Sequence, residues 1–168
     1  MTSKADYSPE QWRLLAGVPV AIGLSVILAE DQGGRQATRK ELAALEAAPG
    51  KVAAEFADNA LVQALLADVK ANAAAEQVEK HSREKGQTEQ RIYEETYRMC
   101  KQVAAVLFVK TTYEEARGYK RFAAGVGAEV ARAAADAEYL GIGGGTLSSN
   151  ERKLLRALCE AMGLDLDD

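Results

Sequence analysis

The sequence predicts an all-α protein, folded as a single bundle of seven or eight helices in antiparallel hairpins. Of the 168 residues, 32 are alanine, the strongest helix former and a poor filler of a wide core. Hydrophobic residues make up 48% of the chain but aromatic residues only 6%, so we expect closely packed helices rather than a thick sheet core. Bulky apolar residues also recur at helical spacing, and no run alternates convincingly as a strand would.

Length and charge indicate one soluble domain that spans residues 1–168. The chain carries a net charge of -4, which argues against binding to the phosphate backbone of nucleic acid. The residues before the first apolar run include Asp6 and Glu10, so we expect no secretory signal. Cys100 and Cys159 match no metal-binding spacing, and we expect two buried thiols in a reducing cytoplasm.

The first helix is expected to begin at a capping box at residues 8–11. Pro19 is expected to end or kink it, because proline lacks the backbone N–H. A second helix, apolar on nearly every face, is predicted from 18 to 30 and belongs at the centre of a bundle. The uncharged segment 14–29 is shorter than the ~20 residues that span a bilayer. We therefore expect no transmembrane span, but a helix buried in this fold or against another chain. Peripheral contact with a membrane stays open as an alternative.

The next two helices are predicted from caps and breakers. A capping box at 38–41 starts a short helix that Pro49 and Gly50 are expected to end near residue 48. The following helix is expected to begin near Val52 or after Asn59, which is itself a good capping residue.

Three further helices are predicted. The first runs from 89 to 110. The second begins after threonine caps at 111–112 and ends near 139, and the third begins at a capping box at 148–151 and ends at Gly163. A seam of small residues at 123, 127 and 131 would let two helix backbones approach closely. Helical spacing predicts buried faces on the helices after residue 59, comprising Leu61, Val62, Leu65, Leu66, Val69, Ile92, Thr96, Met99, Cys100, Val103, Val106, Leu107, Tyr119, Phe122, Val126, Val130, Ala133, Leu154, Leu155, Leu158 and Met162.

Two joints between helices share one pattern, at residues 29–41 and 135–151. In each, a helix ends at an acidic residue, glycines follow, and a Ser/Thr-x-x-Glu capping box opens the next helix. The pattern predicts an internal duplication with pseudo-twofold symmetry, whose halves would be 8–75 and 88–164. The alternative is that capping boxes and glycines are common to many helix–turn–helix joints.

The second joint, Ala135-Asp136 followed by Ser148-x-x-Glu151, resembles the TerB-like helical domain associated with tellurite resistance. The stretch after Tyr139 is also similar to uncharacterised bacterial helical proteins. The resemblance covers about thirty residues, and the chain departs from it by an insertion at 137–147. It implies an all-α bacterial domain of paired hairpins.

The TerB-like resemblance also implies that acidic residues at the helix joints bind a divalent metal. The matching residues are Asp31, Glu41, Asp136 and Glu151. Their oxygen ligands would suit calcium or magnesium. The alternative is that no cofactor binds and that Glu41 and Glu151 only cap helices, because each stands three positions after a capping hydroxyl.

Two other segments invite a binding hypothesis. The glycine-rich loop 141–145 could present backbone N–H groups of Gly143, Gly144, Gly145 and Thr146 to an anion or phosphate. It follows a helix and lacks the lysine of a P-loop, so a flexible connector is the simpler interpretation. Arg117, Lys120 and Arg121 form a basic patch, which neighbouring glutamates are expected to offset.

The sequence holds little of the chemistry that catalysis needs. His81 is the sole histidine, which excludes the HExxH zinc motif and the paired Glu-x-x-His motifs of di-iron bundles. We therefore expect a non-enzymatic cytoplasmic protein that acts by interaction or as a scaffold, in a bacterial stress-response or membrane-proximal assembly. Its partner would be another protein or a second copy of the chain.

Overall fold

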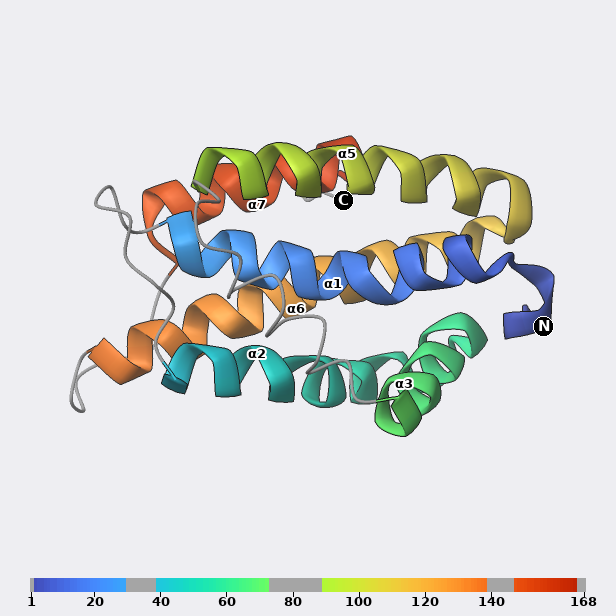
Figure 1. Ribbon diagram of the computed structural model, residues 1–168, viewed down its shortest axis with the longest axis horizontal. Helices are drawn as coiled ribbons and strands as arrows, with labels where there is room; N and C mark the ends of the chain where they lie inside the picture. Colours follow the sequence, from blue (N-terminus) through green and yellow to red (C-terminus); the bar gives the residue numbers. More distant parts are fainter. Residues whose placement is uncertain (1, 30–38, 73–88, 139–146, 166–168) are drawn as a thin grey trace.

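The computed structural model describes residues 2–29, 39–72, 89–138 and 147–165, except for the side chains of 40, 41, 69–72, 89 and 134–138. Within these ranges every regular element is a helix, so the all-α fold class is confirmed. The elements are two short 3-10 helices, η1 (Lys4–Asp6) and η2 (Ala53–Phe56), and the α-helices α1 (Pro9–Ala29), α2 (Arg39–Val52), α3 (Ala60–Asn72), α5 (Glu89–Lys110), α6 (Tyr113–Glu138) and α7 (Ser149–Ala161) (Figure 1).

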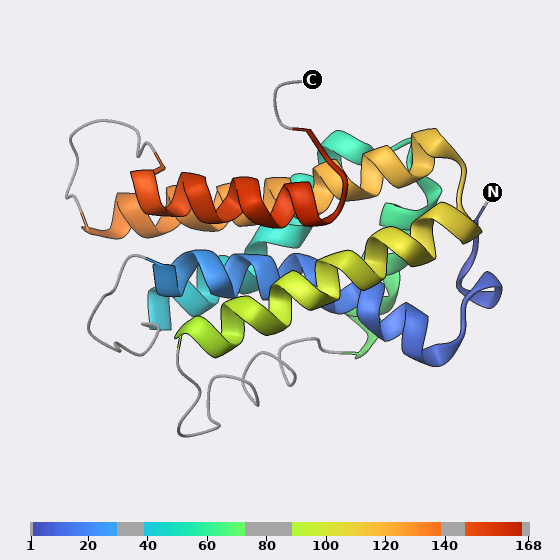
Figure 2. The ribbon, with the colours of Figure 1, turned by 90° about the horizontal axis from the view of Figure 1, so that it is seen from above.

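Helix α1 forms the centre of the bundle, as its all-round apolar character predicts. Helix α6 packs beside it and runs in the same direction, while α2, α5 and α7 run the opposite way (Figures 1 and 2). Parallel helices beside each other, each followed by a helix that returns, are compatible with the predicted duplication, which stays a prediction together with the helix count. The buried residues of α1 are Trp12, Leu15, Val18, Pro19, Ile22, Gly23, Leu24, Ser25, Val26 and Ile27.

The predicted buried faces are largely confirmed where the side chains are described. One core cluster contains residues from every described α-helix. The predicted residues that are buried are Leu61, Val62, Leu65, Thr96, Cys100, Val103, Leu107, Tyr119, Phe122, Val126, Val130, Leu155, Leu158 and Met162. Half-buried at the edge of this core are Leu66, Ile92, Met99, Val106 and Leu154.

Small residues let the helices approach closely, as the seam at 123, 127 and 131 predicts. A Cβ at Gly127 would lie 2.8 Å from Ile22 Cγ2 and 3.0 Å from Leu155 Cδ1. Only hydrogen at this position allows α6 to contact both α1 and α7 at this distance. Ala123 and Ala131 are buried on the same helix.

The helix ends predicted at Pro19 and at Pro49 are wrong, while the alternative of a kink at Pro19 stays a prediction. Helix α1 continues through Pro19, and α2 continues through Pro49 and Gly50 to Val52. Each proline removes one hydrogen bond within its helix, but neighbouring bonds and side-chain packing maintain the helix. The Pro19 side chain is buried, and the Tyr119 hydroxyl of α6 replaces the lost donor at the Leu15 carbonyl.

Predicted caps determine most of the other helix ends. At the start of α1, Ser8 N donates to Gln11 Oε1 at 3.0 Å and Gln11 N donates to Ser8 Oγ at 3.2 Å, which confirms the capping box. Asn59 caps α3, because its Oδ1 accepts from Val62 N at 3.0 Å. After α7 the chain turns at Gly163, whose φ of 68° favours glycine.

Helix α1 is long and apolar enough to cross a membrane, by length and composition alone. Core helices of soluble proteins and signal sequences can be equally long and apolar. In this bundle 56% of its most apolar window is buried against other helices. The apolar segment 14–29 therefore contributes to the core of its own fold.

Candidate functional site

Three segments that are distant in the sequence meet at one end of the bundle. They are the N-terminal segment before α1, the turn between α5 and α6, and the start of α3 (Figures 1 and 2). Lys110 Nζ at the end of α5 donates to the carbonyl oxygen of Asp6 at 3.1 Å. The Thr2 hydroxyl donates to the Glu115 carboxylate on α6. These contacts hold the N-terminal segment against the α5–α6 turn.

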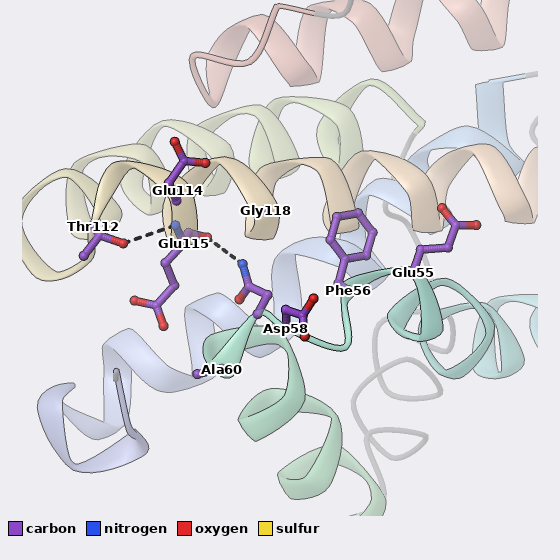
Figure 3. Close-up of a pocket in the computed structure, with 9 residues that line it drawn as sticks. Glu55, Phe56, Asp58, Ala60, Thr112, Glu114, Glu115 and Gly118 are labelled. Carbon is purple, nitrogen blue, oxygen red and sulfur yellow. Dashed lines mark hydrogen bonds between the residues drawn. The ribbon is translucent and has the colours of Figure 1, made fainter.

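Asn59 joins the start of α3 to the start of α6. While its Oδ1 caps α3, its Nδ2 donates to the carbonyl oxygen of Glu115 at 3.0 Å (Figure 3). This approach requires glycine at 118, because a Cβ there would clash with Asn59 Nδ2 at only 2.2 Å. Thr112 begins α6 by accepting from Glu115 N at 3.3 Å. The two helix starts are therefore positioned by their own capping side chains.

Between these helix starts lies a cleft of about 450 Å³, which we call the acidic cleft (Figure 3). It is lined by Glu55, Phe56, Asp58, Asn59, Ala60, Thr112, Glu114, Glu115 and Gly118. Its volume falls in the roughly 300–1,000 Å³ range of small-ligand sites. Four of its lining residues carry a carboxylate. The structure records no ion pair between Glu55, Asp58 or Glu114 and another residue among those it describes.

The four carboxylates are spread along the acidic cleft rather than gathered at one point (Figure 3). No group of three or more histidine, cysteine, aspartate or glutamate side chains could hold a metal ion in the part of the chain that the structure describes. A cleft with dispersed negative charge suits an extended ligand with several positive groups better than a single coordinated ion.

An exposed apolar surface stands beside the acidic cleft, at the turn between α5 and α6. Phe108 is 89% exposed, Val109 75% and Tyr113 74%, and we call these three residues the apolar corner. Among the described residues, the one further large apolar side chain of this class is Tyr97 at 37%. Single exposed apolar residues are ordinary on protein surfaces, but here three large ones stand within six positions, at the end of α5 and the start of α6.

Within the N-terminal segment, Tyr7 is buried, and its hydroxyl has no hydrogen-bond partner among the described residues. Its side chain is 7% exposed, and its ring centroid lies 5.7 Å from that of Trp12. Trp12 Nε1 donates to Asp68 Oδ2 at 2.8 Å, but the Tyr7 hydroxyl has no hydrogen-bond partner among the described residues. Burial, followed by the negative charge of Glu115, raises the pKa of Tyr7 to about 12.

Of the four residues that the TerB-like resemblance implies for a metal, one has a described side chain. Glu151 is buried and accepts from Ser148 N at 2.8 Å, while Glu151 N donates to Ser148 Oγ at 3.2 Å. This is the predicted capping box. Asp31 and the side chains of Glu41 and Asp136 lie outside the described residues. The metal hypothesis therefore rests on the sequence alone.

The predicted anion-binding loop falls on residues that the structure does not describe. Gly143, Gly144, Gly145 and Thr146 lie outside the described residues, and so does His81. The anion hypothesis for loop 141–145 stays a prediction.

The predicted basic patch lies on α6, where Arg121 is exposed and Arg117 and Lys120 are half-buried. Lys120 Nζ donates to the carbonyl oxygen of Gly163 at 3.4 Å, at the C-terminal end of α7. A lysine there complements the helix dipole, while burial lowers the pKa of Lys120.

Sequence reasoning missed both the apolar corner and the acidic cleft. One signal for the corner was present, because Phe108 and Val109 follow the buried Leu107 directly and a helix cannot bury three consecutive residues on one face. The cleft gave no such signal, because its carboxylates come from segments more than fifty residues apart.

Comparisons of the chain with known protein families, with curated proteins and with solved structures find no match. The TerB-like resemblance of the joint at 135–151 therefore stays a prediction.

Proposed function

We propose that the protein is an interaction module, and that it binds a protein partner at the apolar corner. The observation that carries this proposal is the joint exposure of Phe108, Val109 and Tyr113 at one turn. Aromatic residues are enriched at the centres of protein interfaces, because a large ring that leaves water contributes much of the binding free energy.

The fold gives no local reason for these three residues to be apolar. The adjacent helix ends are already stabilised by polar groups, since Thr111 Oγ1 donates to the Leu107 carbonyl at 2.7 Å and Thr112 caps α6. Serine or lysine at 108, 109 or 113 would be compatible with the same turn. Apolar side chains that the monomer does not bury are therefore better explained by a contact with another molecule.

Binding is also favoured over catalysis by the chemistry of the neighbouring cleft. The titratable side chains that line it are four carboxylates, and no histidine, cysteine or lysine is among its described lining residues. Nucleophilic catalysis needs a nucleophile held beside a base. A surface of dispersed carboxylates beside an apolar patch is instead suited to recognition.

The test is a comparison of partners captured by the full-length chain and by two triple variants. Phe108→Ser, Val109→Ser and Tyr113→Ser together remove the apolar corner. Ala43→Ser, Ala47→Ser and Ala67→Ser are the matched control, because these residues are exposed on α2 and α3. Partners are quantified by mass spectrometry after capture from the host cell extract, and size-exclusion chromatography with mass measurement detects self-association.

We expect a specific partner, or a dimer, with the parent chain and with the control variant, and its loss with the corner variant. The melting temperature of the corner variant should not fall, because the substituted side chains are exposed. A corner variant that retains every partner and the same mass as the parent chain would contradict the proposed function.

A further inference from the structure

We infer that the partner presents a basic amphipathic peptide segment, whose apolar side chains cover the apolar corner and whose Lys or Arg side chains enter the acidic cleft. The inference rests on the proposed function, since it names the chemistry of the partner that the corner binds. It is carried by the adjacency of the two surfaces along the chain and by the negative charge of the acidic cleft.

The apolar corner and the acidic cleft share one segment of the chain. Tyr113 belongs to the corner, and its neighbours Thr112 and Glu114 line the cleft. Successive residues of a helix point about 100° apart, so Tyr113 and Glu114 stand on adjoining faces of the first turn of α6. One bound segment can therefore contact both surfaces without bending around the bundle.

The charge of the acidic cleft is largely uncompensated from within the described protein. Glu114 and Glu115 stand in the first turn of α6, where they complement the helix dipole, and both residues border the cleft. Their side chains point to opposite sides of α6 (Figure 3). Glu55 comes from η2 across the cleft, and Asp58 follows it.

No lysine or arginine is among the described residues that line the cleft. Lys110 is directed to the Asp6 carbonyl. Arg117 lies one turn beyond Tyr113 and does not line the cleft. A partner that brings its own cations gains from this surface, whereas an acidic partner or an anionic lipid surface is repelled.

The dimensions favour a peptide segment over a smaller cation. The carboxylates are too dispersed to surround one metal ion in the described structure. A small polyamine could neutralise the cleft but would leave Phe108 and Val109 exposed to water. A segment with apolar and basic residues at helical spacing satisfies both surfaces at once, in the manner of helix-in-groove recognition.

The experiment uses a labelled Leu/Lys peptide with amphipathic helical spacing as the probe, and its Leu/Glu counterpart as the control peptide. Binding to the full-length chain is measured by fluorescence anisotropy. The cleft variant carries Glu55→Gln, Asp58→Asn and Glu114→Gln. The matched charge control carries Glu46→Gln, Glu94→Gln and Glu160→Gln, which remove as many exposed carboxylates elsewhere on the bundle. The corner variant described above completes the set.

We expect the parent chain and the charge control to bind the Leu/Lys peptide, and the Leu/Glu peptide to bind neither. The cleft variant should bind roughly tenfold more weakly, because three exposed ion pairs each contribute modestly, and its affinity should depend less on salt. The corner variant should lose at least as much affinity for the Leu/Lys peptide. All substituted side chains are exposed, so unchanged melting temperatures show that folding is not the cause.

Three results would overturn the inference. One is equal weakening of the cleft variant and the charge control, which would show attraction by net charge alone. Another is full displacement of the peptide by spermine with no effect of the corner variant, which would assign the cleft to a small polycation. The third is binding of the corner to zwitterionic vesicles regardless of the cleft variant, which would assign it to a lipid surface.

The same variants separate this inference from the proposed function. If the corner variant loses its captured partner but the cleft variant keeps it, the interaction module stands and its basic partner does not. If the corner variant keeps every partner, the proposed function itself fails.

Discussion

The hydroxyl of Tyr119 donates a 2.7 Å hydrogen bond to the carbonyl oxygen of Leu15, inside the core of the bundle. Leu15 stands four positions before Pro19, which has no N–H to offer that carbonyl. A side chain of α6 thus supplies the donor that the sequence of α1 lacks. The bond explains how the central helix continues through its proline while it is buried on most sides.

Replacement of Tyr119 by phenylalanine should destabilise the fold by about 1–3 kcal/mol, because the buried carbonyl of Leu15 loses its donor. Chemical denaturation with urea measures this loss. In a Pro19→Ala background the cost should be smaller, because the alanine can offer its own backbone N–H to Leu15. An equal cost in both backgrounds would show that the hydroxyl does not compensate for the proline.

Replacement of Tyr7 by phenylalanine should leave the stability of the fold unchanged or raise it. Its buried hydroxyl has no hydrogen-bond partner among the described residues, so its removal eliminates a desolvation cost without breaking a bond. We expect unchanged stability or a gain of up to about 1 kcal/mol. Tyr119→Phe is the matched comparison, and a loss at Tyr7 as large as that at Tyr119 would reveal a bond to this hydroxyl.

Cys100 and Cys159 should not react with thiol reagents while the protein is folded. Both side chains are fully buried, and burial raises the pKa of each thiol to about 12. At neutral pH almost no thiolate forms, and the thiolate is the reactive species. Ellman's reagent should therefore titrate both thiols in denaturant and neither in buffer. Rapid reaction in buffer would indicate that the core opens locally.

Stability should fall as the pH rises above about 9, where unfolded cysteine and then tyrosine begin to ionise. Tyr7, Cys100 and Cys159 keep their protons in the folded state up to about pH 12, and burial raises the pKa of Tyr119 well above its ordinary value. The unfolded chain thus binds fewer protons in this range, which makes unfolding more favourable. Urea midpoints measured across the range test this, and Cys100→Ala with Cys159→Ala should flatten the decline.

Replacement by alanine should raise the stability of the protein at one helical glycine and lower it at another. At Gly50 nothing lies within 4 Å of the added Cβ, so Gly50→Ala should stabilise α2 by about 0.5–1 kcal/mol. At Gly127 the Cβ would meet the buried Ile22 and Leu155, so Gly127→Ala should destabilise by about 1–3 kcal/mol. Thermal melts of both variants check the pair, and a loss at Gly50 would contradict the open space around it.

The elements best predicted were those with both a cap and an uninterrupted apolar stripe. Helix α5 has the predicted bounds, and α6 begins directly after its predicted threonine caps. Local physics suffices there, because the capping hydroxyls and the helical periodicity point to the same structure. The errors fell where local signals and packing disagree, at Pro19 and Pro49. Proline is a helix breaker in isolation, but burial against other helices outweighs one lost hydrogen bond.

The sequence by itself determined that this chain is helical, which faces of its helices are buried and where most helices are capped, because those features depend on neighbours within one or two turns. Only the tertiary structure decided that α1 continues through Pro19, since the Tyr119 hydroxyl that compensates for it bonds across 104 positions of the chain. It also decided that Glu55 and Asp58 border the same cleft as Glu114 and Glu115, beside an exposed apolar corner. Such a surface arises when the helices pack, and no periodicity within a single segment encodes it.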